Sequence, residues 1–91
     1  MAITLKKLTL AQAEKQFPGC ITEEIKELQE VNKLEAGYHE LGSLDGKLLS
    51  SCYEIAYLSW SIWQDGEWQD LDHADYALLE RLNEEDSISW R

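Results

Sequence analysis

Proline, cysteine and basic residues are scarce in this chain. Its 91 residues include one proline, two cysteines and eight Lys or Arg against 18 Asp or Glu, for a net charge of -10. Nucleic acids and anionic membranes are bound by clustered Lys and Arg, so this charge argues against both as direct partners. Cys20 and Cys52 are far apart and belong to no CxxC pair. We therefore expect two reduced, partly buried thiols.

Long apolar runs and targeting segments are also missing. Lys6 and Lys7 interrupt the N-terminal apolar residues before a signal peptide could form, and no run is long enough to cross a bilayer. The apolar fraction of 44%, with four Trp and four Tyr, is high enough to drive folding. We expect a single cytoplasmic domain, residues 1–91, that does not associate with a membrane.

Motifs for catalysis and metal binding are absent from the sequence. His39, His73 and the two cysteines form no CxxC, HxxxH or HExxH pair, and no serine lies in a GxSxG elbow. The acidic series from Asp65 to Asp75 lacks the spacing of a calcium-binding loop. The sequence therefore predicts a protein that is not an enzyme and that uses no cofactor and no metal ion.

Capping residues and apolar spacing predict two helices in the first half of the chain. Thr9 and Gln12 have the form of a capping box, and Pro18 with Gly19 would end the short helix that follows. Thr22 is the next N-cap, with acidic residues in the first turn. Beyond it, apolar residues at helical spacing predict a helix over residues 22–41: Leu28, Val31, Leu34, Tyr38 and Leu41.

The segment 45–63 carries few charges and many large apolar groups, so we expect it to form the core. Its apolar residues also recur at helical spacing, which predicts a second long helix joined to the first by the glycine-containing connection 42–46. This helical hairpin would pack with the short first helix and with a helix over residues 72–83 that is capped by Asp72. The predicted fold is mainly α, a compact small helical domain.

One motif conflicts with a helix that continues through Trp63. In WQDGEW, residues 63–68, Asp65 and Gly66 suit a type I′ turn that would place Trp63 opposite Trp68 on paired strands. Residues 48–62 show no clean alternation of apolar and polar residues, which favours the helix. The alternative is an α+β fold with a β-hairpin that turns at Asp65-Gly66. The tail, residues 84–91, is either frayed or an added edge strand.

Acidic and aromatic residues carry the functional prediction. Surface charge of one sign steers a partner of the other sign, and tryptophans often dominate binding energy. We therefore expect an inhibitor that masks a basic surface of a partner protein, such as a nucleic-acid-binding site, by acting as a nucleic-acid mimic. The predicted partner-binding residues are Glu23, Glu27, Glu30, Asp65, Glu67, Trp68, Asp70, Asp72 and Asp75.

In size and acidity the chain is similar to several unrelated classes of small protein: immunity proteins of bacteriocins and toxins, phage-encoded inhibitors, and acidic antitoxins. This likeness lies in composition and covers no motif, so it assigns a role to no residue. It implies a phage or bacterial protein that acts through a protein–protein interaction. The alternative function is a structural or adaptor protein that forms a homodimer through the apolar helix predicted at residues 45–63.

Overall fold

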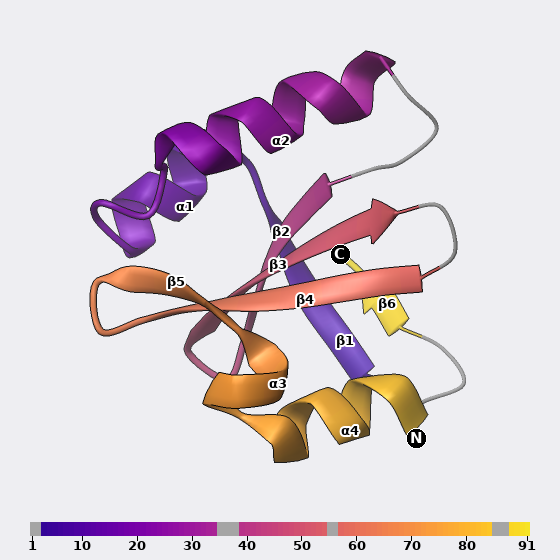
Figure 1. Ribbon diagram of the computed structural model, residues 1–91. Coiled ribbons are helices and arrows are strands. Elements are labelled where there is room, and N and C mark those ends of the chain that lie inside the picture. Colours follow the sequence, from indigo (N-terminus) through magenta and orange to yellow (C-terminus); the bar gives the residue numbers. More distant parts are fainter. Residues whose placement is uncertain (1–2, 35–38, 55–56, 85–87) are drawn as a thin grey trace.

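The computed structural model describes residues 3–34, 39–54, 57–84 and 88–91 of the chain. Six strands form one mixed sheet with helices on both faces, as Figure 1 shows. The prediction of a mainly α, helical protein is therefore wrong, and the fold is α+β. The strands are β1 (Ile3–Leu8), β2 (His39–Leu44), β3 (Lys47–Glu54), β4 (Tyr57–Gln64), β5 (Glu67–Asp70) and β6 (Ile88–Trp90).

The strands lie in the order β5-β4-β3-β2-β1-β6, so β5 and β6 form the two edges of the sheet. Neighbouring strands run antiparallel except β1 and β6, which are parallel. Ile88 of β6 lies opposite Ile3 of β1 and packs against the core. Of the two alternatives for the C-terminal tail, the structure has the edge strand.

Both Asp-Gly pairs of the chain form two-residue turns between strands. Asp65 and Gly66 have φ angles of 56° and 76° and connect β4 to β5. Two successive residues with positive φ are the property of a type I′ turn, so the alternative hairpin at this position is present. Asp45 and Gly46, predicted to lie between two helices, have φ angles of 51° and 78° and connect β2 to β3 in the same way.

The described residues of the segment 45–63 contribute Leu48, Leu49, Trp60 and Ile62 to the core, but from strands β3 and β4 rather than from a helix. Leu48 packs in one apolar cluster and its neighbour Leu49 in the other, on the opposite face of the sheet. Because both faces are covered, apolar residues occupy successive positions, and this removes the alternation by which a strand is recognised. Within the described part of the predicted homodimer seam, Leu48, Leu49 and Ile62 are buried in the protein's own core.

The helices form one layer on each side of the sheet (Figure 1). On one side are α1 (Leu10–Gln16) and α2 (Glu23–Leu34), and on the other are α3 (Leu71–Ala74) and α4 (Tyr76–Glu84). The capping box is confirmed, because Thr9 and Gln12 exchange side-chain and backbone hydrogen bonds at the start of α1. Thr22 precedes α2, and its hydroxyl accepts a hydrogen bond from the Ile25 amide at 3.4 Å.

Two helix boundaries differ from the prediction. α2 ends at Leu34, and Leu41, predicted to extend its apolar stripe, instead lies in β2. The helix predicted over residues 72–83 is divided into α3 and α4 at Asp75, which has a φ of -155°. Asp75 rather than Asp72 caps the longer of these two helices. Tyr38, together with residues 55–56 of the segment predicted as a helix, lies outside the described residues.

Both cysteines are free, as predicted. Cys20 is buried and Cys52 is partly buried. Among the helices that the structure describes, none has the length and apolar character needed to cross a membrane.

Candidate functional site

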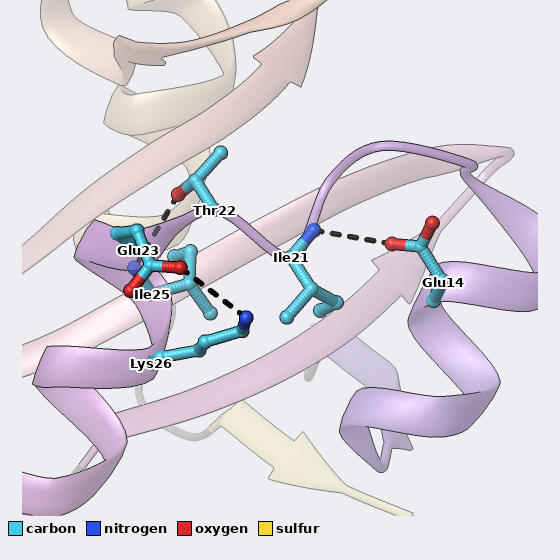
Figure 2. A network of polar contacts seen from close by, with 6 residues as sticks. All are labelled: Glu14, Ile21, Thr22, Glu23, Ile25 and Lys26. Atoms are coloured by element: carbon cyan, nitrogen blue, oxygen red, sulfur yellow. Dashed lines mark hydrogen bonds and ion pairs between the residues drawn. The ribbon is translucent and has the colours of Figure 1, made fainter.

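The acidic residues of α2 form the first part of the predicted binding surface. Glu23, Glu27 and Glu30 are spaced at i, i+4 and i+7, and all three are exposed. Ile25 is buried on the sheet side of the same helix. Glu23 forms an ion pair of 3.4 Å with Lys26, one turn further along (Figure 2). Exposed pairs of this kind contribute little to stability. The three exposed glutamates give α2 an acidic outer face.

A second acidic surface surrounds the outermost strand, β5. We define the acidic edge as the four exposed carboxylates of Asp65, Glu67, Asp70 and Asp72. The chain contains no Lys or Arg between residues 48 and 80, so no base is nearby in sequence. Glu67 accepts a hydrogen bond of 3.3 Å from the Gln69 side chain. Asp65 and Asp70 form no ion pair with any residue in the described part of the chain.

Asp75 differs from these carboxylates because it stabilises the protein's own fold. One of its oxygens accepts a hydrogen bond from the Leu78 amide at 3.2 Å, which caps α4. The other lies 3.4 Å from the ammonium group of Lys47, at the start of β3. Asp75 is also half-buried, whereas the acidic edge is exposed. A change of Asp75 would therefore affect stability as well as surface charge.

Trp68 also makes its main contacts within the protein. Its ring is in edge-to-face contact with that of Trp63, with centroids 5.6 Å apart and planes at 60°. Both rings pack against the apolar cluster beneath α1 and α2. The indole Nε1 of Trp68 donates a hydrogen bond of 2.8 Å to the carbonyl oxygen of Cys20. Trp68 is one of the nine predicted binding residues, but these contacts leave only a limited part of its surface for a partner.

Glu14 has a structural role that was not predicted from the sequence. From α1, its carboxylate accepts a hydrogen bond from the backbone amide of Gly19 at 2.9 Å. It accepts a second from the amide of Ile21 at 3.3 Å, which Figure 2 shows. Glu14 and Trp68 therefore hold the loop between α1 and α2 from two directions. This loop contains the buried Cys20, and burial raises the pKa of its thiol, with a further rise from the Glu14 carboxylate. The sequence feature that could have indicated this role is the position of Glu14, one helical turn before the Pro18-Gly19 pair that ends α1.

Three residues at the junction of β5 and α3 come close enough to share a cation. Asp70, Asp72 and His73 each place one ligand atom within 4.8 Å of the others. His73 Nε2 lies 3.6 Å from Asp72 Oδ1. None of the motifs CxxC, HxxxH and HExxH describes this group, whose three members lie within four consecutive positions. All three are exposed, and exposed acidic groups of this kind are common in proteins without a bound ion.

The predicted binding residues therefore occupy two separate surfaces. Glu23, Glu27 and Glu30 lie on α2, and the acidic edge lies on the β4–β5 turn, β5 and α3. The loop over Trp68 lies between them, but no hydrogen bond or ion pair joins the two sets in the part of the chain described. Comparisons with family models, with curated proteins and with solved structures give no match, so the proposal below rests on the chain's own geometry and charge.

Proposed function

We propose that this chain is a non-enzymatic binding protein that masks a basic surface of a partner protein. The observation that carries the proposal is the acidic edge, where exposed carboxylates follow an outer strand and Asp65 and Asp70 have no ion-pair partner among the described residues. A partner that supplies Lys or Arg would complement this surface, steer its own approach and gain specificity from the match.

Repulsion within the acidic edge favours such a partner. Carboxylate oxygens of Asp70 and Asp72 lie within 4.8 Å of each other. Two like charges at that separation repel by roughly 1 kcal/mol even in bulk water, and by more where solvent is excluded. A cationic side chain placed between them converts this repulsion into attraction. Binding of a basic partner therefore relieves an unfavourable feature of the free protein.

A surface that binds nucleic acid is the target class that best fits this charge. Such surfaces are basic because they neutralise phosphates, and a protein carrying clustered carboxylates competes for the same Lys and Arg side chains. The proposed outcome of binding is therefore inhibition by occupation of the basic site. The homodimer alternative depended on an apolar helix at residues 45–63, and the strands found there leave it without a supporting observation.

Affinity capture across a salt series tests this proposal. The tagged protein is exposed to lysates of its source organism and of that organism's hosts or competitors, and bound proteins are identified by mass spectrometry. We expect one basic protein to be retained at low salt and released as salt rises. The edge variant Glu67→Lys/Asp70→Lys/Asp72→Lys should lose it, whereas the matched variant Lys6→Glu/Arg91→Glu, changed at exposed bases, should retain it. Equal retention by both variants would contradict the proposal.

A further inference from the structure

We infer that the basic partner docks as an extended strand along the outer edge of β5 and bonds to the backbone of Trp68 and Asp70. The inference rests on the proposed function and specifies the geometry of its binding surface. Pairing of this kind extends the sheet by one strand, so backbone hydrogen bonds supply affinity while alternate side chains supply selectivity.

The register of the β4–β5 hairpin shows which backbone groups face outward. Gln64 lies opposite Glu67 next to the two-residue turn, which is the position of a hydrogen-bonded pair. Hydrogen-bonded and non-hydrogen-bonded pairs alternate in an antiparallel ladder, so Trp68 and Asp70 occupy the non-hydrogen-bonded positions. Their amide N–H groups therefore point away from β4. Among the described strands, β4 alone pairs with β5, and no other described strand occupies its outer side.

The negative charge of the β5 edge determines which kind of strand can pair with it. Exposed strand edges pair readily with other strands, and natural proteins place charges there to prevent unwanted pairing. A second copy of β5 would bring its own Glu67 and Asp70 against the acidic edge, so pairing between identical edges is opposed. A strand with Lys or Arg at alternate positions carries these charges on one face and meets attraction instead, from Asp70 or from Glu67 according to which face of β5 they lie on.

Asp70 permits a test that separates backbone pairing from charge. Its φ is -61° and its ψ is 130°, values that proline adopts without strain. Gln69 before it lies in a strand, which is also compatible with a following proline. Asp70→Pro therefore removes the outward N–H and the charge while preserving the hairpin. Asp70→Ala removes the same charge and keeps the N–H, so it is the matched control.

The probe is a capped octapeptide of alternating Lys and Val, titrated into isotopically labelled protein and followed by NMR. We expect the largest shifts at the amides of Trp68 and Asp70, and slower hydrogen exchange at both. Asp70→Pro should bind about fivefold to tenfold more weakly than Asp70→Ala, as expected for one lost hydrogen bond. The same peptide N-methylated at every residue keeps its charge but has no backbone N–H to donate, and its methyl groups hinder pairing, so it should bind much more weakly. Thermal unfolding of each variant verifies that it is folded.

The possible results distinguish this inference from the proposed function. Equal affinities for Asp70→Pro and Asp70→Ala, or undiminished binding of the N-methylated peptide, would overturn docking on the edge. Absence of binding by the octapeptide to the unchanged protein at low salt would overturn it too. In each case the proposed function still stands if capture of a basic protein depends on the acidic edge. Capture that is insensitive to the edge variant removes both.

Discussion

The indole of Trp68, on the outermost strand, donates a 2.8 Å hydrogen bond to the backbone carbonyl of Cys20, 48 residues earlier in the chain. This bond ties β5 to the loop between α1 and α2. Trp68→Phe keeps an aromatic ring but removes the donor, and leaves the partly buried Cys20 carbonyl with only its 3.0 Å hydrogen bond from the Thr22 amide. We expect the free energy of unfolding to fall by about 1 to 2 kcal/mol, measured by urea denaturation.

A suitable control for Trp68→Phe is Tyr76→Phe, because Tyr76 is an exposed aromatic residue with 59% of its surface accessible. Its unfolding free energy should remain within about 0.5 kcal/mol of that of the unchanged protein. If Trp68→Phe were as stable as this control, the hydrogen bond from Trp68 to Cys20 would contribute nothing to stability. It would then not be what holds β5 to the loop between α1 and α2.

Asp75 should behave as a structural residue rather than as part of the binding surface. Asp75→Ala removes both the cap of α4 and the ion pair with Lys47, and we expect it to lower the free energy of unfolding by about 1 to 2 kcal/mol. Asp75→Asn retains a side-chain oxygen for the cap, so its loss should be below about 0.5 kcal/mol. Urea denaturation of the two variants checks this difference. Similar losses would show that the ion pair, not the cap, is the stabilising contact.

Ser51 should tolerate loss of its hydroxyl. The side chain is fully buried in β3, and its Oγ has no hydrogen-bond partner among the described residues. Ser51→Ala removes an unsatisfied polar atom, so stability should stay unchanged or rise by up to about 1 kcal/mol. The neighbouring buried Ser50 does have a partner, and Ser50→Ala should lower stability by about 1 kcal/mol. Thermal unfolding compares the stability of the two variants. A lower stability for Ser51→Ala than for Ser50→Ala would contradict this prediction.

The two cysteines should differ in reactivity and in its dependence on pH. Burial raises the pKa of the Cys20 thiol and Glu14 raises it further, so Cys20 remains protonated at a pH where an ordinary cysteine ionises. The thiolate is the reactive form, so iodoacetamide should modify the partly exposed Cys52 first and Cys20 only as the pH rises. Mass spectrometry of the alkylated protein gives both rates. Glu14→Gln should speed the reaction of Cys20 at a fixed pH.

The sign of this pKa shift also determines how stability depends on pH. A thiol whose pKa is raised by folding ionises more readily in the unfolded chain, so the unfolded state is favoured as the pH rises into the range where unfolded cysteine loses its proton. The Cys52→Ser variant isolates the contribution of Cys20. In that variant, alkylation of Cys20 at pH 8 as fast as that of a free thiol would contradict its burial.

Features determined by neighbouring residues could be predicted from the sequence. The capping box of Thr9 and Gln12, the start of α2 after Thr22, and the end of α1 before Pro18 depend on atoms within one helical turn. The type I′ turn at Asp65-Gly66 is equally local, although the helix was preferred there. Such signals identify where elements begin and end, but they do not identify what a long apolar segment pairs with.

The central strands could not be recognised by periodicity, because their environment is created by distant parts of the chain. Leu48 and Leu49 are both fully buried, one under each helical layer, so the polar positions of a one-sided strand are missing. Gly42, the first residue of the connection predicted between two helices at residues 42–46, lies in β2 opposite Leu49 and Lys7. The carboxylates of the candidate site could be named from sequence, whereas the bonds made by Glu14 and Trp68 depend on tertiary structure.

The association rate constant of the captured basic partner, measured against ionic strength by stopped flow, shows most directly whether the acidic edge binds that partner. Two neutralised variants are compared with the unchanged protein: Glu67→Gln/Asp70→Asn/Asp72→Asn on the acidic edge, and Glu23→Gln/Glu27→Gln/Glu30→Gln on α2. We predict that the edge variant associates more slowly and with a weaker dependence on salt, and that the α2 variant changes less. Identical salt dependence for the edge variant and the unchanged protein would contradict the account.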